Sequence, residues 1–322
     1  PCRLEKHRRT GESSMDTAKR YNSQIKRREF LRKATLGAAA AASIPAALVS
    51  GETHRLAEPH GKLRLSTSSI QYRDLPLEQV CKRIAALGLD AIDVWDGFGG
   101  CRHLDDAETR LGPEGFNALL DRHNLKLASI SVYQGGYGRY AKFLGDLGGG
   151  IAIQGSTQPC KPAEITSKTR AFLQRLKPLV ELAEEHNSQL AFENHGNALL
   201  DSVDSLKAFV DLNQSKRIGI ALAPYHLQAR GASVEEAIEI CGEQLLFFYA
   251  WEQADGIKQL PGHGETDMTA WLAALEKIRY PGYVNPFMHG DLEPRQMDQA
   301  IAQSRDYLKK CFSQSLANPT PK

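Results

Sequence analysis

The sequence predicts a single (β/α)8 barrel over residues 62–312, and three observations lead to this fold class. Short apolar runs alternate with amphipathic stretches, about eight of each over roughly 250 residues, which is the order and size of such a barrel. No low-complexity linker interrupts this alternation. A doubly wound sheet would need fewer units and usually a glycine fingerprint after its first strand, and neither GxGxxG nor GxxxxGK[ST] occurs.

The expected strands are short, apolar and bounded by Gly, Pro or polar residues, as buried parallel strands are. They lie at 63–66, 91–95, 125–132, 150–154, 189–194, 218–223, 245–252 and 283–288.

The expected helices carry apolar residues at a spacing near 3.6 or open on recognisable first-turn residues. Pro113 fits a first turn, and Pro178 is expected to bend the longest helix. Three helices open on Ser or Thr with an acid nearby. The helices are expected at 77–88, 113–124, 140–147, 169–187, 202–212, 233–244, 266–280 and 295–312, with a tail at 313–322.

The net charge of +2 hides an asymmetry along the 322 residues. Residues 1–51 hold 11 Lys and Arg against 4 Asp and Glu, a balance of +7, which leaves the rest of the chain at −5. A hydrophobic content of 42% and a mean hydropathy of −0.39 exclude a polytopic membrane protein and a mainly disordered chain. A basic segment before an acidic body is typical of targeting.

Residues 26–49 resemble a twin-arginine translocation signal. Arg27 and Arg28 precede Phe30-Leu31 and an uncharged apolar stretch, and the resemblance implies that both arginines engage the export machinery. We expect cleavage after Gly51, a periplasmic or other extracytoplasmic location, and Met15 as a possible natural start. The 16 apolar residues fall short of the ~20 that span a bilayer, so a stable membrane anchor is not favoured.

Polar residues at the carboxyl ends of the strands are the candidate site residues, because active sites of these barrels form there. Glu193 stands out, since a carboxylate buried without a partner costs several kcal/mol and should bind a cation or form an ion pair. The candidates are Gln71, Asp93, Asp96, Tyr133, Gln134, Gln154, Glu193, Asn194, His195, His226, Trp251, Glu252, Asn285 and His289.

Four segments in order resemble the sugar phosphate isomerase/epimerase superfamily, the xylose isomerase-like barrels. They are AFENHGN (191–197), ALAPYHL (221–227), LPGHGETDM (260–268) and YPGYVNPF (280–287). The resemblance implies proton transfer at a carbon next to a carbonyl, assisted by a divalent metal that carboxylates and imidazole hold on strands five to eight.

The resemblance implies a metal set that this chain retains only in part. Glu193 matches the first ligand, His226 remains from the strand-six motif, and Glu252 lies near the usual strand-seven His, with Ala250 or Trp251 as the other possible equivalents. These ligands suit Mn, Mg, Zn or Co. Ala223 replaces the strand-six Asp, and Asn285 replaces the strand-eight Glu that serves as the second acid or base.

The remaining roles are expectations of the same kind. Glu193, His226 and Lys258 are the expected catalytic residues, and Lys258 falls where some epimerases bind sugar or phosphate. The expected contacts with a small-molecule sugar are His195, Trp251, Asn285 and Tyr133.

Loss of the second carboxylate disfavours two-base epimerisation and leaves a one-base isomerisation, or β-elimination from a keto-sugar, with Glu193 or His226 as base. A lyase and a non-catalytic carbohydrate-binding barrel are the alternatives. The −5 body disfavours nucleic acid as a partner. An exported chain is more suited to a free sugar or glycoside than to a sugar phosphate.

Other residues are expected to be structural. The five cysteines after residue 51 are widely spaced without CxxC, which predicts core positions rather than disulfides or a zinc site. Trp271 is expected in the core. The segment 135–140 fits either a lid or an irregular loop. Five histidines are expected on the surface or in loops: His103, His123, His186, His263 and His289.

Overall fold

The computed structural model describes residues 62–317. The predicted leader, with Arg27, Arg28 and the possible start at Met15, therefore lies outside the described residues. Between residues 62 and 317, no helix is both long enough and apolar enough to cross a bilayer.

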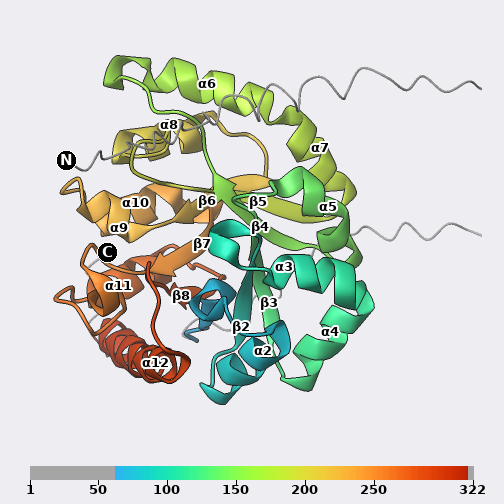
Figure 1. Cartoon of the computed structure of the whole chain (residues 1–322). Helices are drawn as coiled ribbons and strands as arrows, with labels where there is room; N and C mark the ends of the chain where they lie inside the picture. The colour runs from blue at the N-terminus through green and yellow to red at the C-terminus, as the bar shows by residue number, and fades with distance from the viewer. Residues whose placement is uncertain (1–61, 318–322) are drawn as a thin grey trace, which may run out of the picture. The chain divides into compact units, whose positions relative to one another are not determined.

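Eight parallel strands follow one another around the sheet in chain order (Figure 1). Their bounds are β1 (Ser66–Ser68), β2 (Ala91–Trp95), β3 (Lys126–Ser131), β4 (Gly150–Gly155), β5 (Ser188–Glu193), β6 (Ile218–Leu222), β7 (Leu245–Ala250) and β8 (Val284–Pro286). The prediction of a single (β/α)8 barrel is confirmed, because helices connect the strands and surround them on the outside.

The last strand returns to the first and closes the ring. Leu65 bridges to Val284 in parallel, and the Val284 amide donates to the Arg64 carbonyl at 2.9 Å. Side chains strengthen this seam: the Ser66 hydroxyl donates to Asn285 Oδ1 at 2.8 Å, and Asn285 Nδ2 donates to Ser68 Oγ at 3.0 Å. We call these three residues the seam triplet.

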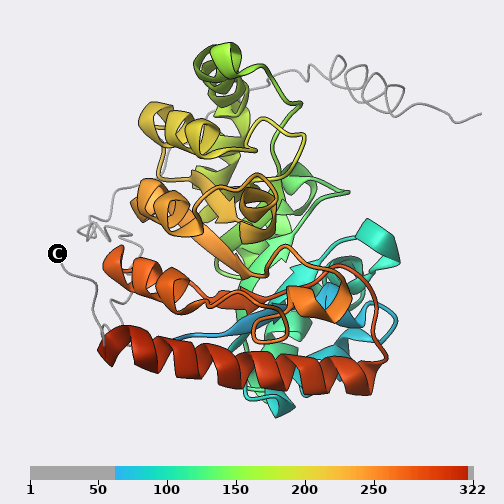
Figure 2. The ribbon, with the colours of Figure 1, turned by 90° about the vertical axis from the view of Figure 1, so that its left-hand side faces the viewer.

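The helices between the strands are mostly those that the sequence predicts. Their bounds are α2 (Leu77–Ala86), α3 (His103–Asp106), α4 (Gly112–Arg122), α5 (Tyr137–Asp146), α6 (Ile165–Arg175), α7 (Lys177–Glu185), α8 (Val203–Leu212), α9 (Pro224–Gln228), α10 (Val234–Cys241), α11 (Thr269–Lys277) and α12 (Pro294–Ala317). Figure 2 shows α12, with 24 residues, running beside α11.

Two differences from the predicted elements have clear causes. The stretch 169–187 forms two helices, because Pro178 opens the first turn of α7, where its missing N–H is not needed. The segment 135–140 is neither a lid nor an irregular loop: Tyr137 and Tyr140 are buried in α5, and the Tyr140 hydroxyl donates to Asp105 at 2.8 Å.

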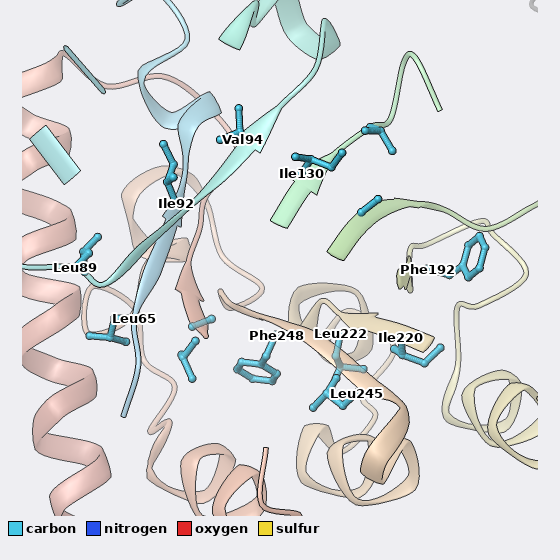
Figure 3. Packing of buried hydrophobic residues seen from close by; sticks show 14 of the residues in the cluster. Leu65, Leu89, Ile92, Val94, Ile130, Phe192, Ile220, Leu222, Leu245 and Phe248 are labelled. Atoms are coloured by element: carbon cyan, nitrogen blue, oxygen red, sulfur yellow. The ribbon is translucent and has the colours of Figure 1, made fainter. Parts of the chain in front are cut away.

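Alternating side chains along the strands make two apolar layers. One side of each strand packs against the helices, as Ile92, Val94 and Phe192 do in Figure 3. The other side fills the barrel, where the large side chains of Phe247 and Tyr249 meet small residues of the other strands. The barrel is therefore a packed core, and chemistry is confined to its mouth.

Gly149 and Gly148 offer a matched test of the turn before β4. Both have a positive φ, +94° and +100°, but a Cβ on Gly149 would lie 2.1 Å from the Asn187 carbonyl oxygen, whereas one on Gly148 meets nothing within 4 Å. We expect Gly148→Ala to cost about 1–2 kcal/mol of unfolding free energy from backbone strain alone. Gly149→Ala should cost at least about 2 kcal/mol more, because backbone must move. Urea unfolding measures both, and equal losses would contradict the predicted clash.

Candidate active site

Glu193 is the last residue of β5 and lies at the carboxyl end of the barrel with about 8% of its surface exposed. Burial raises the pKa of its carboxyl to about 7, and the charge of Asp93 adds to the rise. A hydrogen bond from Tyr133 and the charge of His195 oppose it. Glu193 is therefore a carboxyl that exchanges its proton near neutral pH.

Tyr133, at the end of β3, links Glu193 to a second hydroxyl. It donates to the Glu193 carboxylate, and its hydroxyl lies 3.2 Å from that of Tyr249. Sequence reasoning missed Tyr249, which stands within the apolar run of β7. Its alternation with Phe247 and Trp251 could have identified it, because this period-2 spacing turns all three side chains into the barrel.

Asp93 lies in β2 and is fully buried beneath this site. Its carboxylate accepts hydrogen bonds from the hydroxyls of Ser68 at 2.7 Å, Ser129 at 2.8 Å and Ser131 at 2.9 Å, and from the indole N–H of Trp95. Burial raises the pKa of Asp93 to about 6, although all four hydrogen bonds lower it. Four donors thus hold one carboxylate inside the barrel.

Aromatic rings form a wall around the mouth. Trp95 stacks on Phe287 with ring centroids 5.6 Å apart and an interplanar angle of 11°, and its ring lies 4.9 Å from that of Tyr133. On the other side, Trp251 stacks on Tyr225 at 4.5 Å and 22°. Such rings offer the apolar faces on which the C–H surfaces of a small ligand can pack.

The predicted residues His195 and His226 lie together, with ring centroids 4.0 Å apart. Burial lowers the pKa of His226 to about 3, and the charges of His195 and His289 add to the effect, so His226 is neutral at pH 7. His226 Nε2 and Trp251 Nε1 are buried and have no hydrogen-bond partner within the described chain. Such atoms are available to a bound ligand.

Two other buried carboxylates at the strand ends accept hydrogen bonds from backbone amides. Asp96 accepts from two amides of the loop after β3. Glu252 Oε2 accepts from the amides of Glu265 at 3.2 Å and Thr266 at 2.9 Å. Beyond Ala250 the chain leaves the sheet, because the Glu252 amide donates to the carbonyl of Gln259, so Glu252 organises its own loop.

These positions do not fit the metal set that the resemblance implies. Glu252 faces the 264–266 loop, Ala223 offers no side-chain ligand, and Asn285 belongs to the seam triplet. Among residues 62–317, no group of three His, Cys, Asp or Glu side chains is arranged to hold a metal ion. The predicted combination of Glu193, His226 and Glu252 is therefore not assembled as a metal centre.

Three more predicted residues have these surroundings. Asn285 is fully buried in the seam triplet, a position that does not favour contact with a sugar. Lys258 lies exposed on a short 3-10 turn (Gly256–Gln259) of the loop after β7. Asn194 clamps the strand-six end, because its side chain accepts from the Ala223 amide at 2.6 Å and donates to the Ala223 carbonyl at 3.1 Å.

Among the residues expected to be structural, His103 needs correction. It is buried rather than exposed, with Nε2 2.8 Å from the Leu75 carbonyl oxygen and Nδ1 3.2 Å from Cys101 Sγ. His289 is exposed as expected, yet its ring packs against Trp251 at 4.8 Å. Trp271 and four of the five cysteines described are buried, as predicted.

The fold and the strand-end residues together define a TIM-barrel protein whose mouth carries a buried carboxyl, tyrosine hydroxyls and an aromatic wall. The chain belongs to the xylose isomerase-like TIM barrel family, whose sequence profile matches residues 81–311. A comparison with curated protein sequences finds no match.

Solved structures of sugar epimerases share this fold. The 3-keto-D-glucoside 4-epimerase YcjR from E. coli has a TM-score of 0.62 at 16% identity, over 78% of this chain and 100% of that one. A D-psicose 3-epimerase, crystallised with D-fructose, has 0.64 at 15%, over 78% and 99%. The IolI protein, with a bound zinc atom, has 0.60 at 16%, over 78% and 99%. At these identities the likeness establishes the fold.

Proposed function

We propose that the chain is a sugar or keto-sugar isomerase or epimerase-like enzyme in which Glu193 moves a proton at a carbon next to a carbonyl. The observation that carries the proposal is Glu193 itself, a nearly buried carboxyl at a strand end with a pKa of about 7. A base is most effective when its pKa lies near the working pH. With a pKa of about 3, His226 is a much weaker base.

The arrangement supports one-base chemistry. The strand-eight position holds Asn285, which can neither take nor give a proton, and its amide is engaged with two serines. Asp96 and Glu252 are held by backbone amides. Isomerisation or β-elimination needs one base, so a lyase acting on keto-sugars stays within the proposal. The part of the chain that the structure describes assembles no ligand set for a metal ion, so the proposed chemistry uses its side chains.

The proposed substrate is an uncharged sugar or glycoside. The described residues that act on the Glu193 carboxyl are the Tyr133 hydroxyl, the His195 imidazole and the Asp93 carboxylate, and none of them is a lysine or arginine that would hold a phosphate. Lys258, the expected phosphate or sugar contact, lies exposed on its loop. Export through the twin-arginine route, which the sequence of residues 26–49 supports, would also bring the enzyme to free sugars.

The experiment is a deuterium-exchange screen in D2O. The protein is incubated with D-fructose, D-psicose, D-tagatose or a 3-keto-glucoside, and NMR follows deuterium at the carbon next to the carbonyl and any new sugar or elimination product. We expect exchange with at least one of these uncharged sugars and less with D-fructose 6-phosphate. Calorimetric binding of a sugar without any exchange would contradict the enzyme and favour the carbohydrate-binding barrel.

A further inference from the structure

Removal of a proton next to a carbonyl leaves negative charge on the carbonyl oxygen, and an enzyme must stabilise that oxygen. The resemblance assigns this task to a divalent metal, but residues 62–317 do not assemble the ligand set. A hydrogen-bond donor close to the base is the other general solution.

The hydroxyl groups beside Glu193 form a directed chain of donors. The Ser131 hydroxyl uses its only hydrogen on the Asp93 carboxylate, at 2.9 Å. Tyr249 lies 3.2 Å from the Tyr133 hydroxyl and 3.5 Å from Ser131 Oγ, so its better contact is with Tyr133. The arrangement that serves every acceptor has Tyr249 donating to Tyr133, and Tyr133 donating to Glu193.

We propose that Tyr133, supported by Tyr249, turns its single hydroxyl hydrogen from Glu193 to the substrate's carbonyl oxygen and stabilises the enolate, so that enolisation needs no divalent metal. The inference rests on the proposed role of Glu193. Because Tyr133 is hydrogen-bonded to the Glu193 carboxylate, the donor and the base lie side by side, as the carbonyl oxygen and the C–H hydrogen of an O=C–C–H group require.

The step balances with the groups present. The Glu193 carboxylate takes the proton from the carbon next to the carbonyl, and the electron pair of the C–H bond forms the C=C bond. The π pair of the carbonyl moves to its oxygen, which accepts the Tyr133 hydrogen that the Glu193 carboxylate gives up when substrate binds. In the reverse step the oxygen returns this pair, and protonated Glu193 gives its proton back to carbon. No outside oxidant or reductant is required.

The surroundings keep both tyrosines as donors. Burial and the charge of Glu193 raise the pKa of Tyr133 well above its ordinary value, and burial with the charge of Asp93 does the same for Tyr249. Both hydroxyls therefore stay protonated at neutral pH. A donor that itself receives a hydrogen bond is polarised by it, which strengthens the bond it donates.

The test measures deuterium exchange from D2O into the sugar found active among those above, before and after dialysis against EDTA. We expect Tyr133→Phe to lower kcat about 100-fold or more with KM nearly unchanged, as when other oxyanion donors are removed. Tyr249→Phe should lower kcat about 10-fold. The matched control is Tyr137→Phe, another buried tyrosine, whose hydroxyl partner is Ser188 on the other side of the barrel wall, and it should keep the wild-type rate.

The outcomes separate the two proposals. Full activity of Tyr133→Phe, or loss of activity in EDTA with recovery on adding Mn²⁺, overturns the hydroxyl donor and leaves the role of Glu193 standing. Absence of exchange from the wild-type protein with every sugar overturns both. Circular dichroism of each variant establishes that it is folded, and a KM effect without a kcat effect would assign Tyr133 to binding alone.

Discussion

Glu193→Gln is expected to lower the rate of proton exchange at the carbon next to the sugar carbonyl by about 1,000-fold, because the amide keeps the shape of the side chain and cannot accept the proton. The matched control is Glu252→Gln, a buried acid two strands away that is held by amides of its own loop. This control should stay within about threefold of the wild-type rate. Deuterium exchange followed by NMR measures both.

The pH dependence follows from the raised pKa of Glu193. The base must be ionised, and burial raises its pKa to about 7, so kcat/KM should rise with pH through neutrality and level off above it. An ordinary exposed glutamate would have reached that plateau near pH 5. A flat profile between pH 5 and 8 would exclude Glu193 as the base, and so would equal losses in Glu193→Gln and Glu252→Gln.

Asp93→Ala is expected to cost about 3–5 kcal/mol of unfolding free energy. The substitution removes the common acceptor of three serine hydroxyls and the Trp95 indole, and each buried donor left without a partner costs about 1–3 kcal/mol. Four unsatisfied donors would cost more than this in total, but we expect the smaller loss because a water molecule can satisfy some of them. Urea denaturation with an unchanged m-value measures the loss.

Two variants control for this prediction. Ser129→Ala removes one donor and leaves the carboxylate with three, so we expect a loss of about 1 kcal/mol. Asp93→Asn keeps the volume of the side chain and should fall between the two. If Asp93→Ala loses no more than Ser129→Ala, the serines find other partners and Asp93 is not the centre of the network.

The regular part of the barrel could be predicted because it depends on local patterns. The strand at Ala91–Trp95 has the predicted bounds, and its alternation places Ile92 and Val94 toward the helices. The first strand was less accurate: it spans Ser66–Ser68 rather than 63–66, because these residues pair with Ala91–Asp93 of β2 and their serine side chains bind Asn285 across the seam. No pattern in residues 63–68 alone carries information about a partner more than 200 residues away.

The candidate site could be predicted only where a residue's position follows from its own strand. Glu193 ends β5 as expected, and Tyr133 follows β3. Glu252 differs, since a hydrogen bond from its amide to Gln259 takes it out of β7 and toward another loop. The side chain of Tyr249 extends from β7 across the barrel interior to the Tyr133 hydroxyl. Such contacts between strands depend on the assembled barrel, and sequence spacing does not contain them.

The seam triplet also determines which side chain position 285 can accept. Ser68 accepts from Asn285 and donates to Asp93, so one hydroxyl separates position 285 from a buried carboxylate. A glutamate at 285 would lose the donor to Ser68 and would add a second buried negative charge beside the first. A glutamate at this single position is therefore unfavourable unless Asp93 or Ser68 also changes. The neighbours of position 285 thus favour a neutral amide over a carboxylate.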